Sequence, residues 1–360
     1  MIFAISDVTH QTAWILFFLV AIGIVSLKKA SSPSLSPETT GALKGFAILA
    51  VIFSHIEYFL VTDHEFLFPL GILAGVGVNL FLLLSGFGLA RSTSEYPVNL
   101  ITFYKKRLAK LFLPLWMILL VSWVLDYFWL HRSYALLEMA LNAFGIFPTS
   151  DLYAGLNAPF WYFTFLLGYY AIFPWVYRKN HVWRSFFLLI AASLAMTALP
   201  LPVDENVRNL YRLHTLAFPL GVFIASFSPS SKLVARVMRP PVRITIFAIC
   251  AYLFYYTALH SHVGEGIWPE QLTSLVTTLS ILSLAILSPF RSSFLVFVGT
   301  YSYELYLLHW PFLYRYSPLF SILPGAWATL LSFAFLFILA WALQRTTFYI
   351  HAFITKKPAA

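Results

Sequence analysis

Lys44 and His55 are the residues of this sequence whose types and spacing most clearly suggest chemistry. They lie in one apolar stretch, residues 43–61, which is long enough to cross a bilayer as a helix. Eleven positions separate them, which at about 100° per residue is close to three whole turns, so both side chains project from the same helix face. At a rise of about 1.5 Å per residue, the two lie roughly 16 Å apart along the helix axis.

Placing a cation and an imidazole on one face of a membrane helix costs free energy unless that face lines a water-filled cavity. We therefore predict that both side chains line such a cavity. A neutral His55 could remove the proton of a hydroxyl there, and Lys44 could hold an anionic group. The alternative for His55 is a buried ring that hydrogen-bonds to a neighbouring helix.

A second polar stripe lies near the C-terminal end, in the segment GTYSYELYLLHWP. Ser302, Tyr306 and His309 recur there at positions i, i+4 and i+7, so they share one helix face. His309 has either a supporting or a direct role. Glu304 lies on another side of the same helix and needs a partner or water.

Two further segments have both a structural and a functional interpretation. In NLFLLLSGFGLARS, Ser85 and Gly86 are predicted to form a small-residue contact that lets helices approach closely. The segment FYKKRLAK is a basic cluster before a proline. It would bind anionic lipid headgroups or the phosphates of a nucleotide-bearing donor. Its cations are Lys105, Lys106, Arg107 and Lys110.

The composition is that of a membrane protein. Hydrophobic residues make up 60% of the 360 positions and charged residues only 10%, and apolar runs of membrane-spanning length recur along the chain. Cys250 is the only cysteine and lies in an apolar run, which excludes an intramolecular disulfide and a cysteine metal cluster. The N-terminal segment has no basic region and contains Asp7, so we do not expect a cleaved signal peptide. We predict no metal site.

We predict an all-α, polytopic transmembrane bundle with the N-terminus outside and the C-terminus inside. The eleven expected spans are residues 12–27, 43–61, 70–90, 111–130, 160–177, 185–201, 213–227, 244–259, 272–287, 294–313 and 326–343. Residues 133–147 are predicted to form an interfacial helix instead of a span. The chain then divides into an N-terminal signal anchor with a Ser/Pro linker (1–42), a membrane domain (43–355) and a cytoplasmic tail (356–360).

The charges support this topology. Of the 23 Lys and Arg, only Arg132, Arg208, Arg212 and Arg315 are predicted outside, as the positive-inside rule requires. The positive-inside distribution therefore accounts for the net charge of +9, and we expect no nucleic-acid partner. The expected location is a plasma membrane of the bacterial inner-membrane type.

Taken together, these segments resemble the acyltransferase-3 family of membrane acyltransferases, which includes O-acetyltransferases of bacterial surface polysaccharides. The family's basic residue followed at a distance by histidine matches Lys44 and His55. NLFLLLSGFGLA and FYKKRLAKLFLP resemble its Ser-Gly and basic segments, FWYFTFLLGYYAIFP its Trp-led segment, and SYELYLLH its Tyr/His segment. The family usually has Arg in place of Lys44. Arg can make two parallel hydrogen bonds to an anion, whereas Lys acts as a point charge. Its core has about ten helices, so residues 12–27 would be an extra leading span.

The resemblance implies acyl transfer, most often of acetyl, from cytosolic acyl-CoA to a hydroxyl of a cell-surface or lipid-linked glycan. His55 would be the general base or an acyl relay, and Lys44 with the basic cluster would hold the donor. Ser85 and Trp161 would support the acceptor or the site, as would the stripe around His309. No permanently bound cofactor is expected, and the oligomeric state stays open. The alternative is a transporter or flippase of a lipid-linked saccharide without covalent chemistry.

Overall fold

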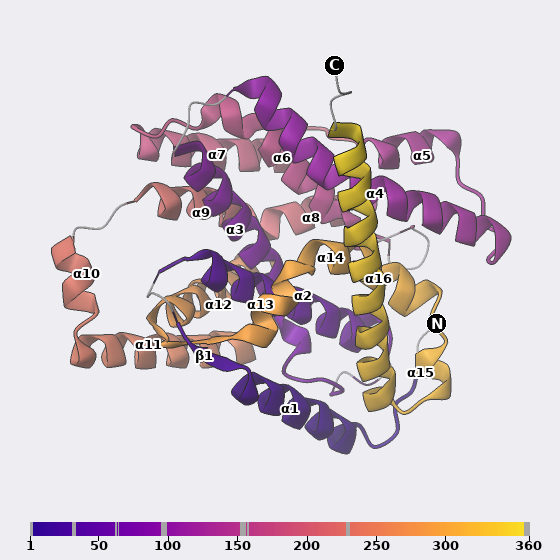
Figure 1. Ribbon diagram of the computed structural model, residues 1–360, viewed down its shortest axis with the longest axis horizontal. Helices are drawn as coiled ribbons and strands as arrows, with labels where there is room; N and C mark the ends of the chain where they lie inside the picture. The colour runs from indigo at the N-terminus through magenta and orange to yellow at the C-terminus, as the bar shows by residue number, and fades with distance from the viewer. Residues whose placement is uncertain are drawn as a thin grey trace.

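A computed structural model describes residues 3–30, 34–61, 63, 65–94, 99–151, 156, 158–227 and 231–355, and almost all regular structure in them is helical. Eleven of the described α-helices are α1 (Val8–Val25), α2 (Pro37–Phe59), α3 (Ala74–Ser94), α4 (Leu100–Phe128), α6 (Trp161–Val176), α8 (Glu205–Leu213), α9 (Ala217–Ser226), α12 (Ile267–Leu287), α13 (Ser293–Thr300), α14 (Ser302–Trp310) and α16 (Gly325–Thr355). The others are α5 (Leu136–Ala143), α7 (Val182–Ala198), α10 (Ser231–Val237), α11 (Pro240–Leu259) and α15 (Leu319–Ile322), with short 3-10 turns at Gly71–Leu73 and Ala158–Phe160. The predicted all-α, polytopic class is confirmed (Figure 1).

Seven of the described helices are long and apolar enough to cross a membrane: α1, α2, α3 with the turn before it, α4, α11, α12 and α16. They correspond to seven of the eleven predicted spans. The other four predicted spans are shorter or broken. α6 has 16 residues, α7 has 17 and α9 has 10. The predicted span at 294–313 is divided into α13 and α14 because Tyr301 leaves the helical conformation between them (φ −106°, ψ 10°).

α5 has eight residues, about 12 Å of helix, which is too short to span a bilayer. This agrees with the prediction that residues 133–147 are not a span. The predicted cytoplasmic tail, 356–360, lies outside the described residues.

α2 lies at the centre of the bundle, between α3 and α13 (Figure 1). Of its most apolar window, 72% is buried inside the protein, against 6% for α11. α2 and α13 approach so closely that a Cβ added at Gly299 would lie 1.9 Å from the carbonyl oxygen of Gly41. Glycine is therefore required at this contact, and it fixes α2 relative to the segment that continues into α14.

A two-stranded antiparallel sheet joins the end of α1 to the start of α13. β1 (Leu27–Lys29) pairs with β2 (Phe290–Ser292), with Lys28 opposite Arg291. α1 itself lies at the edge of the bundle, with only 17% of its span window buried.

A buried ion pair fastens the end of α4 to the segment that follows α14. Arg315 donates to Asp126, and the hydroxyls of Tyr134 and Tyr316 donate to the same carboxylate, Tyr316 at 2.7 Å. Asp126 is fully buried. Burial and the hydrogen bond to Asp126 raise the pKa of Tyr134 to about 12, so Tyr134 is a donor throughout the physiological range. We call these four residues the Asp126 clamp.

Candidate active site

Two cavities open along α2, one beside Lys44 and one beside His55. The helix is continuous between the two residues, so their separation along its axis is the roughly 16 Å expected from eleven residues. Each side chain lines a cavity within the protein, but these are two cavities where the common face predicted a single one. His55 is half-buried and Lys44 is exposed.

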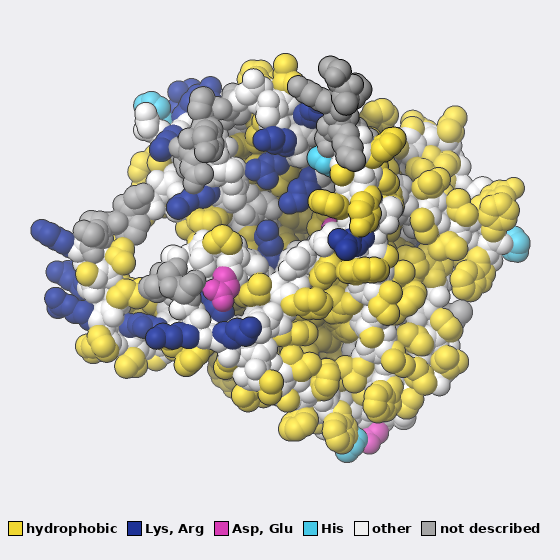
Figure 2. Space-filling view, viewed as in Figure 1, with side chains coloured by type: hydrophobic (Ala, Val, Ile, Leu, Met, Phe, Trp, Pro, Cys, Tyr) yellow, Lys and Arg dark blue, Asp and Glu magenta, His cyan; other side chains and the backbone are white. Residues whose placement is uncertain are grey.

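The first cavity, which we call the basic cavity, has a volume of about 230 Å³. Its cations are Lys44 of α2 and Arg107 and Lys110 of α4. Arg107 donates to Ser92 Oγ at 3.0 Å. None of the described lining residues is acidic, so the cavity suits an anion such as a phosphate. Figure 2 shows Lys and Arg side chains gathered around and inside a hollow in the middle of one face.

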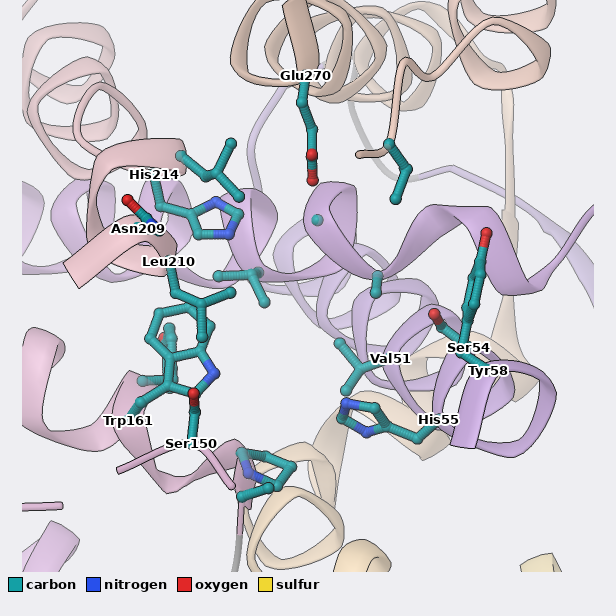
Figure 3. Close-up of a pocket in the computed structure, with 18 of the residues that line it drawn as sticks. Val51, Ser54, His55, Tyr58, Ser150, Trp161, Asn209, Leu210, His214 and Glu270 are labelled. Carbon is teal, nitrogen blue, oxygen red and sulfur yellow. The ribbon is translucent and has the colours of Figure 1, made fainter. Parts of the chain in front are cut away.

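The second cavity, which we call the histidine cavity, has a volume of about 530 Å³. The side chains of His55, Trp161, His214 and Glu270 converge on it from four different helices or helix ends (Figure 3). Most of the remaining lining is apolar, with a few amide and hydroxyl groups such as that of Asn209. A large apolar pocket with a few convergent polar groups is the usual form of a small-molecule site.

Three aromatic residues belong to both cavities: Phe81 of α3, Tyr162 of α6 and Tyr306 of α14. Their rings touch one another, with centroids 6.3 Å apart for Phe81 and Tyr162 and 5.5 Å apart for Tyr162 and Tyr306. We call them the aromatic partition. The basic cavity and the histidine cavity therefore meet at a wall one side chain thick.

His55 is hydrogen-bonded to His309, with 2.8 Å between Nδ1 of His55 and Nε2 of His309. The planes of the two rings are nearly parallel, at an angle of 6°. His309 is fully buried, and its Nδ1 faces the carbonyl oxygens of Leu305 at 3.1 Å and Tyr306 at 2.9 Å.

This geometry fixes which nitrogen of each ring carries the proton. A carbonyl oxygen can only accept, so the proton of neutral His309 is on Nδ1 and its Nε2 has a lone pair. That lone pair accepts from Nδ1–H of His55. The lone pair of neutral His55 is then on Nε2, which is the form that can take up a proton.

The structure brings most of the predicted site residues to these cavities. Ser302 and Tyr306 line the basic cavity, and His309 lies behind His55 on the same helix. Trp161 lines the histidine cavity.

Ser85 and Gly86 have separate positions. Gly86 makes the predicted close contact, because an added Cβ would lie 2.3 Å from the carbonyl oxygen of Phe218 on α9. Ser85 lines the basic cavity and interacts there with the hydroxyls of Tyr162 and Tyr170.

Besides His309, three of the predicted residues line neither cavity. Lys105 and Lys106 are exposed on α4 and line neither cavity. Glu304 is buried beside Gln344 of α16 and near Lys110, and lines neither cavity.

Sequence reasoning missed several lining residues, among them His214, Glu270 and Phe81. His214 follows the polar segment RNLYRL at the start of a predicted span. A histidine at that junction is a weak signal, because nothing local shows that it faces His55.

Residues 41–345 match the model of the acyltransferase-3 family, an acyltransferase domain. The chain belongs to the acyltransferase-3 family. It is also 25% identical over 317 residues to the acyltransferase MdmB of Streptomyces mycarofaciens, a match that covers 76% of this chain and 78% of that protein. No solved structure matches this chain.

The acyltransferase-3 match includes every described residue that lines the two cavities. It begins after α1 and β1 and ends within α16. Membership, together with the seven long apolar helices, makes the protein a multi-pass membrane acyltransferase.

Proposed function

We propose that the protein transfers an acyl group, acetyl in the first instance, from cytosolic acyl-CoA to a hydroxyl of a cell-surface or lipid-linked glycan. The observation that carries this proposal is the pair of cavities that meet at the aromatic partition. The basic cavity has the charge to hold a polyanionic donor, and the histidine cavity offers an unprotonated ring nitrogen.

In this reaction Lys44, Arg107 and Lys110 hold the phosphates of CoA through charge-assisted hydrogen bonds. The pantetheine arm extends along α2, and the aromatic partition has to open for it, so that the thioester comes to lie beside His55. The separation of roughly 16 Å between Lys44 and His55 suits this extended arm.

His55 then acts as the general base. Its Nε2 removes the proton of the acceptor hydroxyl as that oxygen attacks the thioester carbonyl carbon. The C–S bond breaks, the new ester leaves, and the CoA thiolate takes the proton from Nε2. His309 holds the ring in the required tautomer and shares the positive charge that His55 carries between the two steps.

A relay through an acyl-histidine is the second form of this mechanism. Nε2 of His55 would attack the thioester itself, and the acceptor would then take the acyl group from the ring. Acid quenching during turnover with labelled donor distinguishes the two, because only the relay leaves label on the protein.

The proposal is tested with purified protein, acetyl-CoA labelled on the acetyl group, and extracted envelope glycans and glycolipids as acceptors. We expect label to enter the acceptor fraction with release of free CoA. His55→Ala should lower this rate about 100- to 10,000-fold, the range for general-base catalysis. His260→Ala, which changes an exposed histidine at the end of α11, is the matched control. An undiminished rate in His55→Ala would refute the assignment. Transport of a saccharide without release of CoA would instead support the transporter alternative.

A further inference from the structure

His214 is a second imidazole in the histidine cavity, at the C-terminal end of α8. It is 4% exposed and lies across the cavity from His55 (Figure 3). The mechanism above does not use it.

A chain of hydrogen bonds fixes the proton of His214. Ser274 Oγ donates to the carbonyl oxygen of Gln271 at 3.1 Å, so it accepts from Nδ2 of Asn79, also at 3.1 Å. The other end of the Asn79 amide is then Oδ1, which lies 2.8 Å from Nδ1 of His214. Since Oδ1 can only accept, Nδ1 of His214 carries the proton and Nε2 carries the lone pair.

The ring of His214 is also held in place. Trp161 stacks on it, with ring centroids 5.7 Å apart and an angle of 15°. Asn79 is 2% exposed and Trp161 is 7% exposed, so both supports are packed in the protein interior. A buried, oriented acceptor that faces a cavity suits recognition of a donor group on a bound molecule.

We propose that Nε2 of His214 positions the acceptor by accepting a hydrogen bond from a hydroxyl other than the one that reacts at His55. This inference rests on the proposed acyl transfer. Its consequence is that the acceptor carries at least two hydroxyl groups, one directed to each imidazole. Glu270 and Asn209, which line the same cavity, offer further polar contacts to a polyol. A simple monohydric alcohol would lose the contact with His214.

Two substitutions separate this role from a structural one. His214→Asn keeps an amide N–H where Nδ1 donates to Asn79, but removes the acceptor at Nε2. His214→Gln reaches further and places an amide oxygen near the position of Nε2. A merely structural role, through Asn79 and Trp161, would be preserved better by Asn than by Gln.

The experiment measures initial rates with labelled acetyl-CoA against increasing concentrations of the envelope glycolipid extract. We expect His214→Asn to raise the apparent KM for the extract about tenfold or more, the loss of one hydrogen bond to a buried group. His214→Gln should recover part of that loss. The KM for acetyl-CoA should stay at the wild-type value in both. His260→Asn, an exposed histidine that bonds to its own helix, is the control.

Two outcomes would overturn the inference: a KM for the extract equal to that of the wild type in His214→Asn, or a larger defect in His214→Gln than in His214→Asn. The failure of the proposed function has a different signature, because the wild type itself would then transfer no label. Elution of each variant as one folded species in detergent verifies that the comparison concerns intact protein.

Discussion

At the scale of single residues, the site depends on which ring nitrogen holds each proton. His309 is oriented by the carbonyl oxygens of Leu305 and Tyr306, and it orients His55 in turn. His214 is oriented by Asn79. In both cases a buried acceptor holds the proton on Nδ1 and leaves the lone pair of the cavity-facing imidazole on Nε2. His55 and His214, which lie on different helices, thus both present an unprotonated Nε2 to the histidine cavity.

The first prediction concerns His309. His309→Phe removes the acceptor for Nδ1–H of His55, so the ring loses its fixed tautomer and its partner for the charged state. We expect kcat to fall at least about tenfold, which corresponds to about 1.4 kcal/mol in the transition state. His309→Gln should recover part of the rate, because its amide oxygen can accept from His55. Steady-state kinetics with acetyl-CoA measure both. Equal rates in His309→Phe and wild type would contradict the dyad.

The second prediction concerns the donor end. Lys44→Ala should raise the KM for acyl-CoA about tenfold or more, because a hydrogen bond to a charged group contributes about 1.5–3 kcal/mol. Lys44→Arg should retain the wild-type KM, since it preserves the cation. Lys232→Ala, which removes an exposed lysine of α10, is the matched control. An acyl-CoA KM unchanged in Lys44→Ala would remove its proposed role.

The site residues that could be predicted from the sequence are those that lie near one another on the same helix. Lys44 and His55 share one helix, and so do Ser302, Tyr306 and His309, so helical spacing alone places them together. The His55–His309 hydrogen bond joins positions 254 residues apart, and His214 meets Asn79 across 135. Such contacts depend on how the helices pack, which no periodicity within one helix encodes.

At the scale of elements, the position of α14 decides whether His309 reaches His55. α13 holds the start of this segment against α2 through the close contact at Gly299. The Asp126 clamp holds the other end, through Arg315 and Tyr316. α14 is therefore fixed at both ends, although it has only nine residues.

The third prediction tests the clamp. Asp126→Asn leaves Arg315 buried without its counter-charge, and breaking a buried pair in this way costs about 3–5 kcal/mol. We expect a clear fall in Tm and a lower kcat, because α14 loses its anchor. Thermal unfolding in detergent measures the first effect. Glu205→Gln is the control, because that carboxylate pairs with Arg208 and Arg212 at the surface, where ion pairs contribute about 0–1 kcal/mol. Equal Tm shifts in the two variants would contradict the anchoring role.

The elements also show where hydropathy succeeds. Long apolar runs predicted that spans occur at α2, α4 and α16, although α4 begins 11 residues before its predicted start and α16 ends 12 residues after its predicted end. Hydropathy predicted a continuous span at 294–313, because the strongly apolar flanks mask the more polar residues 299–304, GTYSYE. At the break, Tyr301 packs edge-on against Phe337 of α16 and α13 packs against α2, contacts with elements outside the segment.

At the scale of the whole molecule, the two cavities have a fixed order relative to the basic face of the protein. The basic cavity opens among the Lys and Arg side chains of one face (Figure 2). The histidine cavity lies further along α2, beyond the aromatic partition. In a bilayer with the basic face inside, donor and acceptor would approach His55 from opposite sides and meet at Phe81, Tyr162 and Tyr306.

The fourth prediction follows from this order. Acyl-CoA is polyanionic and does not cross a sealed bilayer, so only the face that carries the basic cavity can use it. We expect inside-out membrane vesicles to release CoA from added acetyl-CoA, and sealed right-side-out vesicles to release almost none. Detergent should make the two preparations equal, which verifies that both contain the same amount of enzyme. Lys44→Ala should lower the rate of inside-out vesicles at limiting acetyl-CoA and leave their rate at saturation nearer to the wild type. Equal activity of the two sealed preparations would mean that donor access is not confined to the face with the basic cavity, and the role of that cavity would have to be abandoned.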